Sequence, residues 1–359
     1  MKVRKTLKKF RPYEWEPSSE QLASKMGIKP GSILRFDTNT SPFPPKKILS
    51  ELASSLIEVG VNEYPETSYF KLRSSLSKYT GAKPSQIIVT TGADEALDII
   101  AKTFIDSGTG SLVSAPTYTM FRVVVEVMGG KSMSVLRKDD LTDDVDSILK
   151  AVNDKTRVIF LCSPNNPTGN LTQRNAILRI LQETKCTIVV DEAYVEFCGE
   201  TAMDLINKYQ NLIVLRTFSK AFGLAGARVG YILAAEKTVE LLNIMRPPNS
   251  LSVISLALAI SALRNINHMK KNVGLIVNER ERLSQIIKEL SGIHMYPSSA
   301  NFYLLKFLKL KSSYVYSKLL KQGIVSRDVG DQPKLENCLR FTVRTSKEND
   351  KLLEVLSKL

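Results

Sequence analysis

Apolar and polar positions alternate in two distinct ways between residues 85 and 235. Short runs rich in β-branched side chains are separated by stretches with helical periodicity, which is typical of βαβ units and predicts a mainly parallel sheet. Runs such as Val158–Leu161 and Ile188–Val190 are apolar throughout, so we expect helices to cover both faces of that sheet. The expected helices include Ala93–Phe104, Tyr118–Met128 and Gln173–Glu183. The expected strands are Gln86–Thr91, Ser111–Ala115, Ser132–Leu136, Arg157–Cys162, Thr187–Asp191, Asn211–Thr217 and Arg228–Ala234.

The pattern changes after about Leu251, where a single long helical stretch extends to about Leu290. It is followed by an expected strand over Asn301–Phe307, a helix around Ser313–Gln322, a strand over Cys338–Val343 and a final helix. The first 35 or so residues show no periodic core pattern and are predicted to form an arm. We therefore predict an α/β protein with an N-terminal arm (1–35) that packs with the small domain, a large domain (36–250) and a smaller α+β C-terminal domain (251–359).

Length and composition suit a globular protein with more than one domain. The chain has 359 residues, of which 43% are apolar, so it can bury a large core. Its most apolar region, Leu251–Leu263, carries several serines and is shorter than the roughly 18 apolar residues that a membrane span needs. We therefore expect no membrane partner.

The formal net charge of +14 raises the question of nucleic-acid binding. The positive charges are spread along the chain, however, and no recognisable nucleic-acid module accompanies them. Attraction of a doubly charged phosphate ester is the more economical use of such a charge. We therefore expect small-molecule substrates and no nucleic acid.

Cysteine and histidine usage argues against a metal site. The four cysteines show no metal-ligand spacing, and with only two histidines neither a histidine-based metal site nor a catalytic triad is expected. The cysteines are predicted to be reduced thiols, and the basic start of the chain lacks the apolar run of a secretory signal. Both features predict a cytoplasmic protein without a metal.

The most informative stretch surrounds Lys220, just after an expected buried strand. Small and hydroxyl-bearing residues flank this lysine, so its amine can be desolvated and its pKa lowered toward that of a nucleophile. Arg228, eight residues further on, can offer a guanidinium fork to a phosphate. A single lysine is usually a solvated surface charge, and it is the neighbouring motifs that favour a chemical role here.

Two further motifs follow expected strands. Ser163–Gly169 contains the Asn-Pro turn at Asn166, and such a turn taken alone is more often structural. The strand Thr187–Asp191 ends in acidic residues, and a carboxylate at a buried strand end is costly unless it meets a cation. Capping of a helix is the ordinary alternative for Asp191.

Gly92, Ala93 and Asp94 lie at an expected strand-to-helix junction, where free backbone N–H groups form a ready anion site. Glycine turns of this kind are frequent, so the signal is weak by itself. Tyr118 follows the next expected strand, where its ring could stack on a planar ligand or simply belong to the core.

In this order and spacing, the three motifs resemble the fold-type I, class I/II aminotransferases, which depend on pyridoxal 5'-phosphate (PLP). The resemblance runs over nearly the whole chain and is most specific for the histidinol-phosphate aminotransferase family. It implies the fold-type I architecture, with PLP bound by the large domain. The motifs are Ser-Pro-Asn-Asn-Pro-Thr-Gly at 163–169, Asp-Glu-Ala-Tyr at 191–194 and Thr-Phe-Ser-Lys-Ala-Phe-Gly-Leu-Ala-Gly-Ala-Arg at 217–228.

The resemblance assigns expected roles on the cofactor side. Lys220 would bind PLP as a Schiff base and then serve as general base and acid, while Asp191 would pair with the pyridine nitrogen. Asn166 and the catalytic Tyr194 would hydrogen-bond the ring oxygen, with Tyr118 stacked on the ring. The residues expected around the cofactor phosphate are Gly92, Ala93, Asp94, Ser219 and Arg228.

On the substrate side the same resemblance implies that Arg340 binds the α-carboxylate of the amino donor, a bidentate task for which lysine is poorly suited. Arg327 and Tyr13 would contact the substrate phosphate, and Tyr64 would reach it from the partner subunit of a homodimer with shared active sites. Asn39 and Asn301 also match family positions near the substrate.

Two departures from the family pattern concern the substrate side. Val343-Arg344-Thr345 stands where Val-Gly-Thr is common, and it places a second large cation nearby. Asn39-Thr40-Ser41-Pro42-Phe43-Pro44 replaces the commoner Asn-Glu-Asn-Pro-Tyr-Gly. Both leave the expected cofactor site unchanged.

The expected reaction converts L-histidinol phosphate and 2-oxoglutarate into imidazole acetol phosphate and L-glutamate, a step of histidine biosynthesis. One alternative is a broader aromatic amino-acid aminotransferase, against which Arg327 and Tyr13 argue. Another is a PLP-dependent lyase that resembles threonine-phosphate decarboxylase, toward which the segment 39–44 leans. A PLP-responsive nucleic-acid-binding protein is suggested only by the net charge.

Overall fold

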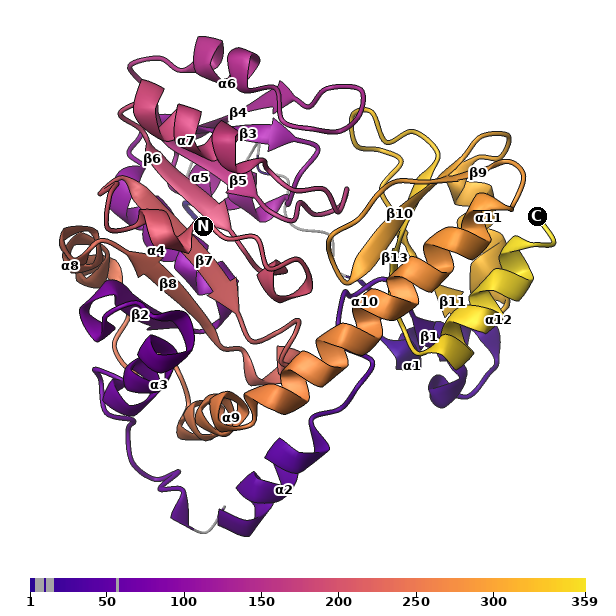
Figure 1. Cartoon of the computed structure of the whole chain (residues 1–359), viewed down its shortest axis with the longest axis horizontal. Coiled ribbons are helices and arrows are strands. Elements are labelled where there is room, and N and C mark those ends of the chain that lie inside the picture. Colours follow the sequence, from indigo (N-terminus) through magenta and orange to yellow (C-terminus); the bar gives the residue numbers. More distant parts are fainter. Residues whose placement is uncertain (4–9, 11–15, 56–57) are drawn as a thin grey trace.

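A seven-stranded sheet forms the centre of the larger part of the molecule (Figure 1). The computed structural model describes residues 1–359 apart from 4–9, 11–15 and 56–57. All seven strands expected from the sequence lie in this one sheet, in the order β2-β8-β7-β6-β5-β3-β4. The strands are β2 (Ile87–Thr90), β3 (Gly110–Ala115), β4 (Lys131–Leu136), β5 (Thr156–Cys162), β6 (Thr187–Asp191), β7 (Leu212–Thr217) and β8 (Gly230–Ala234).

The predicted mainly parallel arrangement is confirmed, with one strand reversed. β8 runs antiparallel to both of its neighbours, β2 and β7. It follows β7 without an intervening crossover helix, and strands joined in that way pair antiparallel. The loop between β7 and β8 carries Lys220 and Arg228, so the reversal returns the chain past the same edge of the sheet.

Helices cover both faces of the sheet, as the apolar strands predict. Alternate side chains of β5 enter two different cores: Phe160 packs with residues of α4, α5 and α8, whereas Ile159 packs with residues of α3, α6 and α7. Burial on both sides explains the continuous apolar runs of the central strands, such as Val158–Leu161 and Ile188–Val190. The helices are α3 (Phe70–Thr80), α4 (Gly92–Phe104), α5 (Met120–Val127), α6 (Val145–Ala151), α7 (Arg174–Glu183) and α8 (Glu236–Met245).

The C-terminal part forms a smaller four-stranded antiparallel sheet in the order β12-β13-β10-β9, with α10, α11 and α12 packed beside it (Figure 1). The expected single helix over 251–290 is instead two helices, because Asn265 leaves the helical conformation and its side chain bonds Glu51 and the carbonyl of Ser261. The elements are α9 (Val253–Arg264), α10 (Ile266–Lys288), β9 (Ile293–Met295), β10 (Phe302–Phe307), α11 (Ser312–Lys321), β12 (Arg327–Asp328), β13 (Cys338–Thr342) and α12 (Ser346–Leu356).

The segment expected to be an irregular arm contains regular structure. Helix α1 (Ser19–Met26) begins with a capping box between Ser18 and Gln21, and β1 (Leu34–Arg35) pairs in parallel with β11 (Ile324–Val325). Leu22, Ala23 and Ile33 pack with Val325 in a small core of their own. The limits proposed for the three parts stay a prediction. The other helices are α2 (Lys46–Ser55) and the 3-10 turns η2 (Pro30–Ser32), η4 (Pro84–Gln86), η5 (Val195–Phe197), η6 (Met203–Leu205) and η7 (Ala225–Ala227).

Over the described residues, no helix combines the length and the apolar character that crossing a membrane requires.

A close approach between β8 and the start of α4 yields a test of the fold. An ideal Cβ on Gly230 would lie 2.5 Å from the carbonyl carbon of Gly92, so backbone must move to admit it. Gly230→Ala is expected to lower the free energy of unfolding by about 1–3 kcal/mol. Gly274→Ala in α10, where a Cβ meets nothing within 4 Å, is expected to raise it by about 0.5–1 kcal/mol. Urea unfolding measures both, and equal stability of the two variants would contradict the packing described.

Candidate active site

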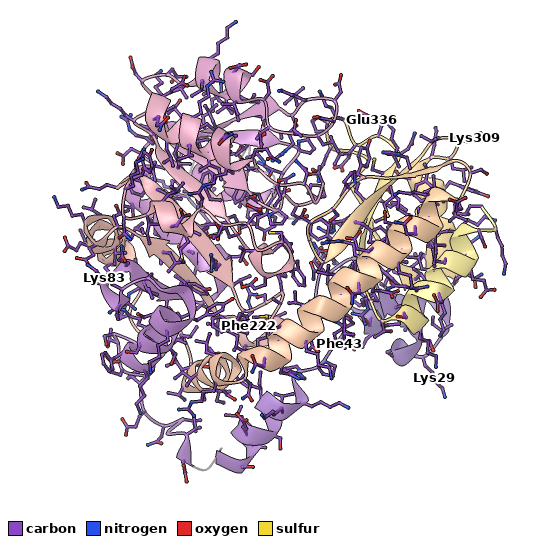
Figure 2. All side chains as sticks on the ribbon, in the orientation of Figure 1. Lys29, Phe43, Lys83, Phe222, Lys309 and Glu336 are labelled. Atoms are coloured by element: carbon purple, nitrogen blue, oxygen red, sulfur yellow. The ribbon has the colours of Figure 1, made fainter. Side chains whose placement is uncertain are left out.

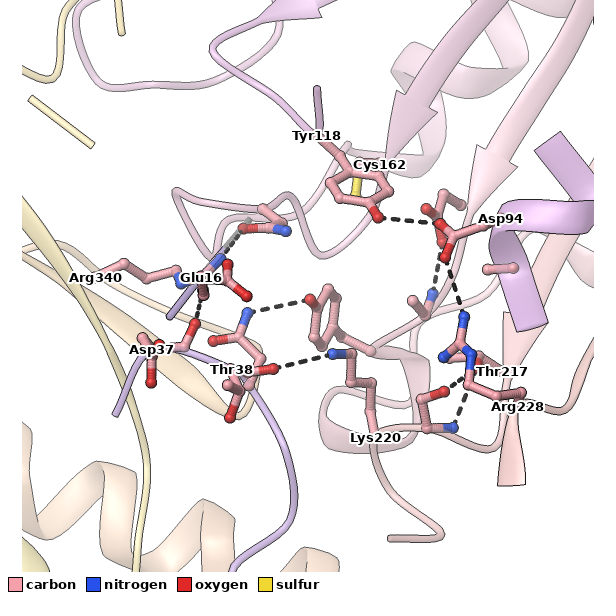
Figure 3. A pocket seen from close by; sticks show the side chains of 17 residues that line it. Glu16, Asp37, Thr38, Asp94, Tyr118, Cys162, Thr217, Lys220, Arg228 and Arg340 are labelled. Atoms are coloured by element: carbon pink, nitrogen blue, oxygen red, sulfur yellow. Dashed lines mark hydrogen bonds and ion pairs between the residues drawn. The ribbon is translucent and has the colours of Figure 1, made fainter. Parts of the chain in front are cut away.

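Lys220 follows the end of β7 and points into a pocket at the carboxyl edge of the large sheet (Figure 3). Its Nζ lies 3.4 Å from the carbonyl oxygen of Thr38 and 5.7 Å from the centre of the Tyr194 ring. Burial of the ammonium group, together with the nearby Arg340 cation, lowers the pKa of Lys220 to about 8. A substantial fraction of the amine is therefore neutral and nucleophilic near neutral pH.

Asp191 ends β6 and is only 4% exposed. Its carboxylate accepts the N–H of Ala193 at 3.0 Å, and no ion pair to it occurs among the described residues. Burial raises the pKa of Asp191 to about 7. A carboxylate in this position is costly until a cation reaches it, which is the property expected of a group that holds a protonated ring nitrogen.

Tyr194 and Asn39 meet on the opposite wall of the pocket. Asn39 Nδ2 donates to Tyr194 Oη at 3.1 Å, and the backbone N–H of Asn39 donates to Thr342 Oγ1 at 2.9 Å. Asn301 is not one of the residues that line the pocket; its Nδ2 donates to the carbonyl oxygen of Asn39 at 3.0 Å. The structure thus places Asn301 behind Asn39, which it positions.

Arg340 crosses from the small sheet to the large one. From β13, its Nη1 donates to Asn166 Oδ1 at 2.5 Å and its Nη2 donates to the carbonyl oxygen of Asp37. Arg340 is 8% exposed, and its Nε has no hydrogen-bond partner among the residues that the structure describes. Burial lowers the pKa of Arg340 without removing its charge. A buried guanidinium that lines a pocket, with N–H groups beyond the two used by Asn166 and Asp37, is suited to an anionic ligand.

The start of α4 forms the other end of the pocket. The first-turn N–H groups of a helix have no intrahelical partner, and Gly92, Ala93 and Asp94 supply them here. Gly92 has φ +75°, and a Cβ there would lie 2.7 Å from Arg228 Nη2, so only glycine lets the guanidinium lie against the helix start. Arg228 Nη2 lies 3.1 Å from Asp94 Oδ2, and Tyr118 Oη donates to Asp94 Oδ1 at 3.0 Å.

Ser219 completes this end of the pocket. Its backbone N–H donates to Thr217 Oγ1 at 3.1 Å, and the two hydroxyls lie 3.0 Å apart. The loop before Lys220 is therefore held in a tight turn that presents hydroxyl and guanidinium donors on one side.

Comparison with known proteins agrees with this geometry. Residues 32–356 match the family model of Aminotransferase class I and II. The chain belongs to this family. Histidinol-phosphate aminotransferases from Thermoanaerobacter pseudethanolicus and Methanocaldococcus jannaschii are 39% and 36% identical to it. The first alignment covers 90% of this chain and 92% of the relative, and the second 100% and 97%.

A solved structure shares the whole architecture. The histidinol-phosphate aminotransferase from Sinorhizobium meliloti, determined in complex with pyridoxal 5'-phosphate, aligns with a TM-score of 0.88 and 27% identity. The alignment covers 99% of this chain and 96% of that one. The fold-type I aminotransferase fold expected from the motifs is confirmed.

Arg327 and Tyr64, two further expected substrate residues of the aminotransferase, do not line the main pocket. Arg327 lines an adjoining pocket with Arg340, and its Nη1 donates to Glu16 Oε1 at 2.7 Å. Tyr64 is 85% exposed and does not line the pocket of its own chain. Tyr13 lies outside the described residues.

The departure at Arg344 does not bring a second cation into the pocket. Its Nη2 lies 2.8 Å from Glu348 Oε1, where it supports the start of α12. Arg344 is not among the pocket residues.

The motif analysis missed several pocket residues of the aminotransferase. Thr217 begins the lysine motif, and Cys162 ends β5 directly opposite Asp191, so strand ends alone could have indicated both. Glu16 carries no sequence signal, because it lies in the supposed arm. The further lining residues are Asp37, Thr38 and Ala193.

The electrostatics of Asp191 predict how stability of the cofactor-free protein depends on pH. The pKa of Asp191 in the folded protein is about 7, above the ordinary value of 3.8 for an aspartate. Ionisation of Asp191 therefore destabilises the fold increasingly as pH rises from 4 to 7, and fully above 7. Asp191→Asn is therefore expected to raise the unfolding midpoint at pH 8, with the gain vanishing near pH 4.

Asp204→Asn is the control of opposite sign. The ion pair with Arg174 lowers the pKa of Asp204, so this carboxylate stabilises the fold above its unfolded pKa and loses that effect in acid. Its removal should lower the midpoint at pH 8. A loss of stability at pH 8 in Asp191→Asn would contradict the stated cost of the buried charge.

Proposed function

We propose that this chain transfers the amino group of L-histidinol phosphate to 2-oxoglutarate, which yields imidazole acetol phosphate and L-glutamate in histidine biosynthesis. The observation that carries the proposal is the convergence of Lys220, Asp191 and Arg340 on one pocket. The identity to histidinol-phosphate aminotransferases over nearly the full chain supports the same reaction.

Pyridoxal 5'-phosphate fits the residues present. Lys220 supplies the amine for its aldehyde, Asp191 the buried carboxylate for its ring nitrogen, and the start of α4 with Arg228 the donors for its phosphate. Asn166 and Tyr194 lie on the side where the ring oxygen would be bound, and Tyr118 lines the pocket between the two ends. When bound, the cofactor supplies an electron sink for the substrate's Cα–H electrons.

The protein's own part of the chemistry is proton handling. With a pKa of about 8, Lys220 Nζ exchanges protons readily near neutral pH, as a general base and acid at the substrate α-carbon must. The Tyr194 ring beside Nζ and the Thr38 carbonyl limit where the amine can lie. Such positioning keeps the proton donor and acceptor aligned in both half-reactions.

The guanidinium of Arg340 is the proposed contact for the carboxylate of glutamate or 2-oxoglutarate. One N–H of Nη1 is held by Asn166 and one of Nη2 by the carbonyl oxygen of Asp37, so the guanidinium plane is already oriented. Arg327, next to it in the adjoining pocket, is the proposed contact for the substrate phosphate.

We also propose that the active enzyme is a homodimer with shared sites. Tyr64 does not line the pocket of its own chain, and large apolar side chains are exposed on the segment 61–70 that carries it and on α8. Exposed apolar groups of this kind mark protein interfaces. They include Val61, Phe70, Leu241, Ile244 and Met245.

A cytoplasmic location is proposed on the basis of the cysteines. All four are free thiols, and three of them are buried. Such usage is typical of proteins in reducing compartments.

Steady-state assays of the PLP-loaded protein test the reaction. Histidinol phosphate is expected to be preferred over phenylalanine and threonine phosphate in kcat/KM, with 2-oxoglutarate as acceptor and no carbon dioxide released. Lys220→Ala should abolish both turnover and the absorbance of covalently bound cofactor. A preference for phenylalanine would contradict the proposed contacts to the substrate phosphate. Release of carbon dioxide from threonine phosphate would show that the protein is a lyase and not a transferase.

Complementation between inactive variants tests the shared site. Mixed dimers of Lys220→Ala and Tyr64→Ala subunits each contain one site with both residues intact, so random mixing should restore about a quarter of the wild-type sites. Lys220→Ala mixed with Arg340→Gln is the control, because both residues serve the same chain and no intact site can form. Absence of restoration in the first mixture, with dimers verified by light scattering, would reject the contribution of Tyr64 across the interface.

A further inference from the structure

Glu16 places a carboxylate at the mouth of the pocket, beside two arginines. It lines both the main pocket and the adjoining one, and Arg327 and Arg340 line the adjoining pocket with it. Figure 3 shows Glu16 and Arg340 together at one end of the main pocket. Glu16 Oε1 accepts a hydrogen bond from Arg327 Nη1 at 2.7 Å, and both side chains are 28% exposed.

The backbone next to Glu16 is fixed independently of this ion pair. The carbonyl oxygen of Pro17 accepts a hydrogen bond from Arg35 Nη1 at 3.0 Å, and Ser18 caps α1. Arg35 is itself held by Asp37 at 2.6 Å. The positions of Pro17 and Ser18 therefore do not depend on the Glu16–Arg327 pair.

We propose that Glu16 is an internal placeholder that occupies the substrate-anion site at Arg327 and is displaced when a phosphate-bearing substrate binds. This inference rests on the proposed function, because it takes Arg327 as a contact of the substrate phosphate. A carboxylate is a smaller and less charged ligand for a guanidinium than a phosphate dianion, so the exchange favours the substrate.

The placeholder has two physical consequences. In its absence Arg327 and Arg340 would face each other as two cations at a partly buried site, a repulsion that Glu16 offsets. An entering dianion must also break the Glu16–Arg327 pair and approach a negative charge, which lowers the affinity of every anion for this site. Glu16 would thus favour ligands with a strong doubly charged group over weaker anions.

Binding of inorganic phosphate to the PLP-loaded enzyme tests the inference, with the cofactor's own phosphate site already filled. Glu16→Gln keeps the shape and removes the charge, and calorimetry is expected to give a Kd for phosphate about two- to fivefold lower than wild type. The gain should shrink at high ionic strength, because the pair is partly exposed.

Glu20→Gln is the matched control, since it removes the same charge from the nearby first turn of α1, outside both pockets. An equal gain in phosphate affinity in both variants would show that the effect comes from the net charge of the protein, and it would overturn the proposal. Unchanged or weaker phosphate binding in Glu16→Gln would overturn it as well. In the Arg327→Gln background the Glu16→Gln gain should disappear, and its persistence would also overturn the proposal.

These readouts separate the placeholder from the reaction. If the wild-type protein did not turn over histidinol phosphate, the proposed function would be rejected. The phosphate titration would still measure the effect of Glu16 on anion binding.

Discussion

The hydrogen bonds of Arg340 link the small antiparallel sheet to the large sheet at the pocket. The guanidinium comes from the centre of the small antiparallel sheet and binds Asn166 on a loop of the large sheet and the carbonyl of Asp37 near β1. Because the side chain is buried, each donor that lacks a protein partner is a strong site for an anion. Arg340 thus takes part both in the proposed ligand recognition and in the contact between the two sheets, which lie on the two sides of the molecule in Figure 1 with side chains between them in Figure 2.

A second constraint is the free-energy cost of burying the charged groups of Asp191 and Lys220 at the cofactor site. Burial raises the pKa of Asp191 and lowers that of Lys220, so both groups are less stable in their charged forms than they would be in water. Opposite shifts of neighbouring acid and base are typical of active sites, where a ligand supplies the missing partner. The fold tolerates this cost because most of the other positions of β6 and β7 are apolar core, Ile188–Val190 and Leu212–Leu215.

Helices and strands could be predicted from the sequence where the pattern of apolar residues is local and periodic. Each central strand was predicted within about two residues, because two-sided burial leaves continuous apolar runs. The break at Asn265 was not predictable, since it depends on a hydrogen bond to the distant Glu51. Helix α1 had a readable signal in its capping box, but few apolar residues to support it.

The same distinction applies to the site. Lys220, Asp191 and Asn166 follow strands, so their approach is a consequence of parallel topology and could be predicted. Asn301 was expected at the substrate, yet lies behind Asn39, and Arg344 turns to Glu348; both outcomes depend on side-chain direction and not on sequence position. Glu16 could be recognised as a site residue only in the folded structure, because no local sequence feature relates it to Arg327, more than 300 residues away.

The net charge of the whole chain does not describe the pocket. Among the residues that line it, four are acidic and three are basic: Glu16, Asp37, Asp94 and Asp191 against Lys220, Arg228 and Arg340. Affinity for an anion must therefore come from which charges are already paired. Asp37 is bound by Arg35 and Asp94 by Arg228, whereas Arg340 keeps N–H groups beyond the two used by Asn166 and Asp37, and Arg327 is paired, among the described residues, with Glu16. The attraction of this site for a phosphate is thus a property of its pairing pattern, and a count of charges would not reveal it.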